Sequence, residues 1–208
     1  MGVNLAIVAC GPQLEVALRT SSERPSSLVR LAGGSPRSTL LLAAADLLVE
    51  DAGVVPGDIE RVLISRGPGS FTGIRAGIAT AQGLAAATGV VIVAYDSLLV
   101  QAARCGSTTG VRAAQPGRRG EVYARAFEVP PGAAPSALGE IEIREVTGLG
   151  GDGPWVAPEP LDLGLAERVA PARSAADALL LLSELGVEPQ PVEPLYVEGP
   201  PIHGKGAP

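Results

Sequence analysis

The chain has 208 residues, of which 46% are hydrophobic, and a formal net charge of −6. This length supports one or two small domains with a buried core, and the hydrophobic content excludes a wholly disordered chain. No apolar run reaches the ~18 residues of a membrane-spanning helix. The apolar N-terminal segment lacks the basic start of a signal peptide, so we expect a cytoplasmic protein.

Scarce residue types exclude several kinds of catalytic site. The chain has one histidine, His203, one lysine, Lys205, and two distant cysteines, Cys10 and Cys105. A Cys/His zinc site needs three or four ligands, a Walker P-loop needs a lysine after its glycines, and a Ser-His-Asp triad needs a histidine. We therefore expect no metal site and no catalytic residue. The cysteines are interpreted as free buried thiols, with a disulfide as the alternative.

Charge is distributed unevenly along the sequence. The net charge is −3 over residues 1–60, +6 over 61–120 and −9 over 121–208. A basic middle segment favours contact with an anionic ligand, a nucleic acid or an acidic partner. Alternatively, residues 67–103 form buried elements that lack acidic side chains because these are costly to bury. This alternative explains less well the basic residues in turn-rich sequence, Arg112, Arg118 and Arg119.

The first hundred residues predict short apolar strands that alternate with helices. The first helix has Ser35 or Ser38 as its cap and Gly53 as its stop, and the helix that begins at Gly73 stops at Gly89. Strands separated by helices in this way favour parallel pairing in an α/β unit. The expected strands cover 3–9, 13–20, 28–31, 62–65 and 90–94, and the expected helices cover 38–51, 73–88 and 97–106.

The second half of the chain predicts strands joined by long turns. An arginine-containing turn at 117–120 leads into a strand of alternating character, and a loop rich in proline, glycine and alanine follows at 130–139. The tail from Gly186 is rich in proline. The expected strands cover 110–114, 121–129 and 141–146, and a short helix capped from Ser174 covers 177–185.

The stretch from Arg66 to Ala87, RGPGSFTGIRAGIATAQGLAAA, is the most informative in the sequence. It passes from a strand through a glycine-rich loop into a helix, and such a helix N-terminus suits an anion. Alternatively, its hydroxyls merely cap the helix. The glycine spacing matches neither the dinucleotide fingerprint nor a nucleophile elbow. The candidate anion- or nucleotide-binding residues are Gly67, Gly69, Ser70, Thr72, Gly73 and Arg75.

Small residues recur every four positions at Gly69, Gly73, Gly77 and Ala81. In a helix this spacing puts them on one face, which permits close approach of a neighbour. That neighbour is either another protein or an element of the same chain. The helix at 38–51 has more aliphatic residues than one buried face needs. The candidate partner-interface residues are Leu40, Leu41, Ala44, Leu48, Gly73, Gly77 and Ala81.

Three motifs carry a specific resemblance to one family. Residues 64–98, ISRGPGSFTGIRAGIATAQGLAAATGVVIVAYDSL, look like the signature of TsaB (YeaZ-like) proteins. RRGEVYARAFE at 118–128 resembles the arginine-rich GEVY strand of that family, and EPLYV at 193–197 resembles its closing PLY segment. The match is strong over 60–128 and weaker but collinear elsewhere.

The resemblance implies an α/β fold with two lobes of mixed sheets and flanking helices, of the actin/sugar-kinase/Hsp70-like (RNase H-like) type. We expect an N-terminal lobe at 1–100 and a smaller, degenerate lobe at 101–208. TsaB proteins are regarded as catalytically silent subunits of the machinery that forms threonylcarbamoyladenosine in tRNA. The resemblance implies TsaD and TsaE as partners, with tRNA bound through the complex. Two copies of the chain could use the same surface that binds TsaD, so a homodimer in isolation is an alternative assembly. ATP and a divalent metal would belong to the partner subunits, so no directly bound cofactor is expected.

The chain departs from the family pattern at three polar positions. It has Ala9-Cys10-Gly11-Pro12 where an Asp-Thr-Ser turn is usual, Arg37-Ser38 for His-Ser, and Pro116-Gly117-Arg118 for Asp-Ala-Arg. These changes favour a noncatalytic scaffold that binds TsaD, with Arg118 and Arg119 as salt-sensitive tRNA contacts. The alternatives are a degenerate ATPase or glycoprotease-like enzyme, or a nucleotide-binding module that uses Gly67–Arg75.

Overall fold

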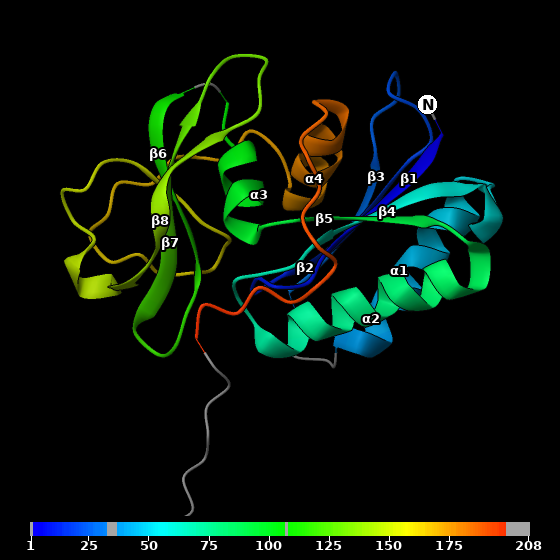
Figure 1. The fold of residues 1–208 in the computed structure, drawn as a ribbon, viewed down its shortest axis with the longest axis horizontal. Coiled ribbons are helices and arrows are strands. Elements are labelled where there is room, and N and C mark those ends of the chain that lie inside the picture. The colour runs from blue at the N-terminus through cyan, green and yellow to red at the C-terminus, as the bar shows by residue number, and fades with distance from the viewer. Residues whose placement is uncertain (1, 33–36, 107, 199–208) are drawn as a thin grey trace, which may run out of the picture.

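The computed structural model describes residues 2–32, 37–106 and 108–198, which form two β-sheets with flanking helices (Figure 1). The first sheet has the strand order β3-β2-β1-β4-β5, and the second has the order β8-β7-β6-β9. Both sheets are mixed, because each combines antiparallel hairpins with parallel pairing. The predicted fold class is therefore confirmed.

The element bounds follow the chain order. The strands of the first sheet are β1 (Val3–Val8), β2 (Leu14–Arg19), β3 (Ser27–Leu31), β4 (Ile59–Ser65) and β5 (Val91–Tyr95). Those of the second sheet are β6 (Thr108–Pro116), β7 (Glu121–Val129), β8 (Ser136–Glu145) and β9 (Trp155–Val156). The helices are α1 (Arg37–Asp51), α2 (Phe71–Thr88), α3 (Ser97–Ala103) and α4 (Ala175–Glu184), with 3-10 turns at Pro56–Asp58 and Val146–Gly148.

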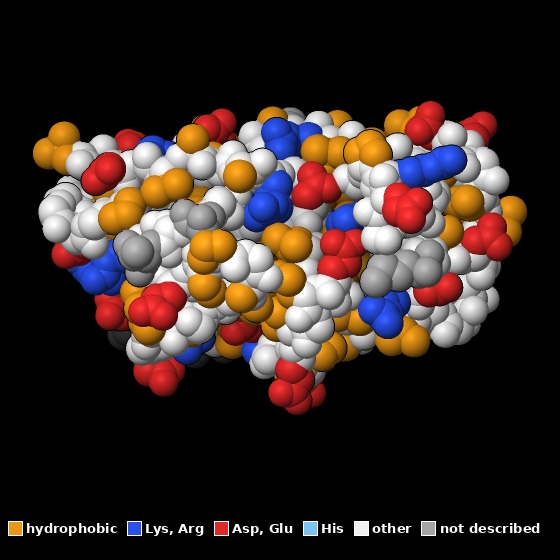
Figure 2. Space-filling model, turned by 90° about the horizontal axis from the view of Figure 1, so that it is seen from above, with side chains coloured by type: hydrophobic (Ala, Val, Ile, Leu, Met, Phe, Trp, Pro, Cys, Tyr) orange, Lys and Arg blue, Asp and Glu red, His pale blue; other side chains and the backbone are white. Residues whose placement is uncertain are grey.

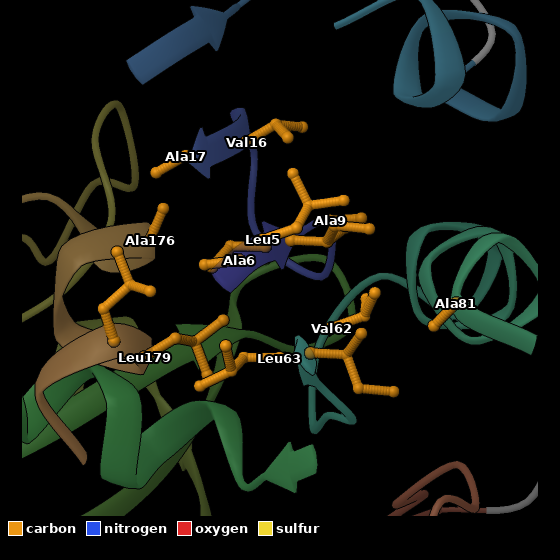
Figure 3. Packing of buried hydrophobic residues seen from close by; sticks show 14 of the residues in the cluster. Leu5, Ala6, Ala9, Val16, Ala17, Val62, Leu63, Ala81, Ala176 and Leu179 are labelled. Atoms are coloured by element: carbon orange, nitrogen blue, oxygen red, sulfur yellow. The ribbon is translucent and has the colours of Figure 1, made fainter. Parts of the chain in front are cut away.

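The central strand β1 is covered on both faces. It pairs antiparallel with β2 and parallel with β4, and its side chains alternate between the two faces of the sheet. α1 and α2 pack on one face, and α4 packs on the other with α3 beside it (Figure 1). In Figure 3, Leu63 and Ala6 point toward Leu179 of α4, whereas Val62 lies on the side of Ala81 in α2. The result is a three-layer core of aliphatic residues, as the scarcity of aromatics requires.

Several predicted boundaries change in the structure. α2 begins at Phe71, two residues earlier than expected, because Ser70 is the residue that caps it. β8 begins at Ser136, inside the predicted loop, because Ser136 pairs with Glu128 of β7 and the ladder continues past Gly139 after a shift in register. The α4 cap is confirmed, since the Ser174 hydroxyl accepts a hydrogen bond from the Asp177 amide.

The later part of the chain returns to the first sheet. α4 contacts β1, β2 and β4, and its buried side chains belong to the same core cluster as those of the first sheet. The second sheet has two smaller clusters of its own, one of them around Trp155. The core of the first sheet therefore includes residues from beyond position 170, while the expected division of the chain near residue 100 stays a prediction.

Three further expectations concern the cysteines, membrane-spanning helices and single residues named in the sequence analysis. Cys10 and Cys105 are both buried, as predicted, and no disulfide joins one to the other. Among the described helices, none is long and apolar enough to cross a membrane. Ser35, His203 and Lys205 lie outside the described residues.

A buried carboxylate joins β2 to α4. Glu15 is 4% exposed, and its Oε2 atom accepts hydrogen bonds from the amides of Ala175 and Ala176 at 2.7 and 3.0 Å. Its Oε1 atom accepts one from Arg30 Nε of β3 at 2.8 Å. Because a helix N-terminus has unpaired amides and a partial positive charge, the carboxylate stabilises the start of α4.

We predict that Glu15→Gln lowers the free energy of unfolding by about 1.5–3 kcal/mol, the usual value of hydrogen bonds to a charged group. The amide that replaces one carboxylate oxygen would also turn an N–H toward other N–H donors. Urea denaturation measures the change, with Glu23→Gln on the exposed β2–β3 turn as the matched control. Equal stability of the two variants would contradict this role for Glu15.

Candidate functional site

The glycine-rich loop between β4 and α2 lies directly on the end of β1. Gly69 has φ +144°, and a Cβ on it would overlap the Cys10 carbonyl oxygen. A Cβ on Gly73 would overlap the Ala9 carbonyl oxygen. The Ser70 amide donates to the Cys10 carbonyl oxygen at 2.7 Å. These glycines are therefore required by close packing against backbone.

The hydroxyls of this loop differ in their surroundings. Ser70 Oγ accepts the Gly73 amide at 3.3 Å and so caps α2, while Thr72 is exposed. Beneath the loop, Cys10 Sγ lies 3.1 Å from Ser65 Oγ and 2.9 Å from Ser97 Oγ, and the Ser97 hydroxyl also accepts the Gly67 amide. The capping interpretation of Ser70 is thus confirmed, and anion binding by the loop stays a prediction.

The stripe of small residues faces the interior of this chain. A Cβ on Gly77 would contact Ala9 Cβ at 3.6 Å and Ile7 Cγ2 at 3.9 Å, both on β1, and Ala81 is fully buried. Of the two interpretations of the stripe, packing within the chain is therefore the one that the structure shows. It lets α2 lie close to the first sheet.

The predicted set of partner-interface residues needs correction. Most of them are covered by the core of this chain, so they present no surface to another protein. Those buried are Leu41, Ala44, Leu48, Gly73, Gly77 and Ala81, and Leu40 is half-buried. On the outer side of the same helix α1, Leu42 is 49% exposed and Leu47 is 57% exposed.

Arg75, in the first turns of α2, contacts two aromatic rings. Its guanidinium lies 3.9 Å above the centroid of the Phe71 ring, and its Nε donates to the Tyr196 hydroxyl at 3.0 Å. The rings of Phe71 and Tyr196 are stacked with centroids 5.0 Å apart. Phe71 and Arg75 are thus held together by a residue 121 positions further along the chain.

Residues 190–198, here called the C-terminal strap, bring Tyr196 to this place. The strap begins beside β5, where the Gln190 amide donates to the Ala94 carbonyl at 2.9 Å. The Leu195 amide then donates to the Arg66 carbonyl at 2.8 Å, and Arg66 Nε forms an ion pair with Asp96 at 2.8 Å. The strap therefore runs from the edge of the first sheet along the glycine-rich loop.

The strap ends on the second sheet. The Glu198 carboxylate lies 3.1 Å from Arg118 Nε, in the turn between β6 and β7, and accepts a hydrogen bond from the Tyr123 hydroxyl at 3.3 Å. Burial, together with the adjacent Glu198 carboxylate, raises the pKa of Tyr123, so the phenol stays protonated and acts as the donor. Arg119, next in the turn, is exposed.

A cavity of about 430 Å³ lies between the glycine-rich loop, the β6–β7 turn and the strap. It brings together predicted residues from both halves of the sequence, Gly69 and Ser70 with Arg118. Gly67, Thr72, Gly73, Arg75 and Arg119 are near it in sequence but do not line it. The other lining residues are Pro68, Phe71, Pro116, Gly117, Tyr123, Leu195, Tyr196, Val197 and Glu198.

Sequence reasoning missed the aromatic character of this cavity. Phe71, Tyr123 and Tyr196 are three of the six aromatic residues in the chain, and all three line it. Composition alone could not separate these three from Tyr95, Phe127 and Trp155, which are buried in the core. Among the described residues, no group of three or more His, Cys, Asp or Glu side chains could hold a metal ion.

Comparison with known proteins places this geometry in a family. The family model described as "TsaD: tRNA N6-adenosine threonylcarbamoyltransferase" matches residues 37–153, more than half of the chain. The chain belongs to this family. The match covers α1, the glycine-rich loop, α2 and most of the second sheet, including the β6–β7 turn that lines the cavity.

Among individual proteins, the chain is similar to ones named TsaB or YeaZ. TsaB of Escherichia coli is 44% identical over 69 residues, 32% of this chain and 30% of that protein, and TsaB of Bacillus subtilis is 31% identical over 96 residues, 46% and 42%. An uncharacterized protein of Mycobacterium tuberculosis is 29% identical over 93% of this chain and 82% of its own length. YeaZ from Pseudomonas aeruginosa has the same fold, with a TM-score of 0.74, 22% identity and coverage of 95% of this chain and 100% of that one.

The packing of α2 on β1 generates a matched pair of predictions. Gly73→Ala should lower the free energy of unfolding by about 3 kcal/mol, because its methyl group would overlap the Ala9 carbonyl. Gly83→Ala, in the same helix with nothing within 4 Å, should raise it by about 0.5–1 kcal/mol through helix propensity. Thermal or urea unfolding measures both, and a tolerated Gly73→Ala would show that α2 is free to move away from β1.

Proposed function

We propose that this chain is a noncatalytic subunit that binds a TsaD subunit and takes part in forming threonylcarbamoyladenosine in tRNA. Membership of the TsaD family and similarity to proteins named TsaB support a role in this tRNA modification. In this proposal TsaE joins the complex, ATP and a divalent metal are held by the partner subunits, and tRNA is bound by the assembly.

The observation that carries the partner-binding role is the outer face of α1 and α2. Leu42 and Leu47 are exposed on a helix whose other side is already buried in the core. α2 packs beside α1 and exposes small residues, Ala79, Gly83 and Ala86. Exposed leucines on α1, next to a row of small residues on α2, suit close packing of another helix, and burying them gains roughly 25 cal/mol per Å².

The contacts of the glycine-rich loop favour a structural role for the loop over a catalytic one. Its Ser70 hydroxyl is used to cap α2, its glycines pack on the carbonyl oxygens of Ala9 and Cys10, and Arg75 contacts Phe71 and Tyr196. Polar groups that would hold a phosphate in an ATPase are thus engaged within the chain. This favours the scaffold over the degenerate ATPase or glycoprotease-like alternative.

Single substitutions Leu42→Glu and Leu47→Glu should each weaken TsaD binding by at least about tenfold, because a charge would be buried at the centre of an apolar contact. Pull-down with TsaD of the same organism measures binding, and a cooperative melt confirms the fold. Leu138→Glu, on β8 of the second sheet and similarly exposed, is the matched control.

The same variants test self-association. If a homodimer uses the outer face of α1, sedimentation will show that Leu42→Glu and Leu47→Glu lose the dimer together with TsaD binding. Folded variants that keep full TsaD binding would place the partner surface elsewhere and remove the main support for the proposal.

The β6–β7 turn should make a small, salt-sensitive contribution to tRNA binding. On the side of α4, Figure 2 shows acidic and basic side chains interspersed among hydrophobic ones, which gives little attraction for RNA there. The pair Arg118→Ala and Arg119→Ala should reduce the salt slope of tRNA binding to the assembled complex by at most about 1.8, two phosphate contacts. Arg24→Ala, on an exposed turn of the first sheet, is the control, and an unchanged slope would make these arginines ordinary surface charges.

A further inference from the structure

Helix α3 joins the two sheets through buried side chains. Val100 and Ala103 belong to the core cluster of the first sheet, whereas Leu98 and Ala102 belong to a cluster of the second sheet. All four are at most 2% exposed. Because separating the sheets at α3 would open two packed cores, this connection should act as a fixed joint.

The strap makes a second connection between the sheets, and its middle lies directly on the glycine-rich loop. In Figure 1 the strap, coloured orange to red, crosses from the first sheet toward the second. The Tyr196 ring stacks on Phe71, and its hydroxyl accepts a hydrogen bond from Arg75. A Cβ on Gly67 would overlap the Leu195 carbonyl oxygen, so this glycine allows the close approach of the strap.

The far end of the strap is held on the second sheet by polar contacts near the surface. The Glu198 carboxylate lies 3.1 Å from Arg118 Nε and accepts a hydrogen bond from the Tyr123 hydroxyl at 3.3 Å. The Arg118 side chain is 56% exposed, and that of Glu198 is 23% exposed. Such ion pairs are weak and are screened by salt. This end of the strap should therefore open far more readily than the joint at α3.

The cavity leaves the glycine-rich loop and the β6–β7 turn without tight packing against each other. Its volume of about 430 Å³ lies between these two segments and the strap. Atoms on opposite walls of such a space lack the dispersion contacts that hold a packed interface together. The spacing of the two sheets on this side therefore depends on the strap.

We infer that the strap is a salt-sensitive latch that fixes the spacing of the two sheets. When Glu198 pairs with Arg118 the latch is closed, and when this pair separates the second sheet moves away from the glycine-rich loop about the joint at α3. The latch is built from this chain alone, so the inference is independent of the TsaD subunit proposed above.

The distance between the two sheets tests the latch in the full chain. Spin labels at Gln82→Cys on α2 and Glu140→Cys on β8 report this distance by double electron–electron resonance, since both positions are exposed. The two native cysteines are buried and should stay unlabelled. Glu198→Gln keeps the shape of the strap but removes the ion pair, so it should shift the distance distribution to longer values. Glu193→Gln, at an exposed acid of the same strap, is the matched control.

Salt and hydrogen exchange give two further measurements. At about 1 M salt, where charges are screened beyond roughly 3 Å, the chain with Glu198 should show the longer distances, and Glu198→Gln should show no further change. The Leu195 amide donates to the Arg66 carbonyl in the closed latch. Its exchange should be about threefold faster in Glu198→Gln, as expected for loss of a surface ion pair, and unchanged in Glu193→Gln.

Each outcome supports or overturns the latch. Longer distances in Glu198→Gln and at high salt, with faster exchange at Leu195, support it. Faster exchange with an unchanged distance distribution would overturn it, because the sheets would then be held by α3 whatever the strap does. Glu198→Gln that matches Glu193→Gln in both measurements would also overturn it, since the ion pair would then hold nothing closed. A cooperative melt of each variant shows that these comparisons are made on folded protein.

Discussion

The contact between the start of α2 and the end of β1 sets the geometry of the rest of the molecule. A helix whose side chains keep it at an ordinary distance from a sheet would hold the glycine-rich loop away from Ala9 and Cys10. Here Gly69 and Gly73 bring loop and helix onto the carbonyl oxygens of these two residues. The direction of α2 is thereby fixed, and with it the positions of Phe71 and Arg75, which both contact Tyr196 of the strap.

The same contact explains how a chain without the usual acidic turn after its first strand keeps the fold. Backbone carbonyls, present whatever the side chain, accept the Ser70 amide, and Cys10 Sγ fills a small polar cluster with Ser65 and Ser97. None of these interactions needs a carboxylate at the strand end. The end of β1 is therefore held by backbone hydrogen bonds and close packing.

How far the sequence predicts this structure depends on the range of the interactions. Local signals were sufficient for β7, with its alternating pattern, and for α4, with its Ser174 cap. The start of β8 was missed because pairing with β7 overrides a loop-like composition, and the strap was missed because a proline-rich tail has no periodicity. Gly69, Ser70 and Arg118 are predicted site residues from distant parts of the sequence, and their meeting in one cavity depends on tertiary structure.

The hydrogen bonds between Glu15 and the start of α4 have a consequence for the order in which the chain folds during translation. β1, β2 and Glu15 leave the ribosome long before Ala175, the residue whose amide the buried carboxylate accepts. Until then one face of the first sheet lacks its helix, and contacts that span such separations form slowly because a long loop must close first. The nascent chain thus carries an open aliphatic surface for most of its translation. Its folding is completed from the C-terminal side, when α4 closes that face and the strap settles across the glycine-rich loop.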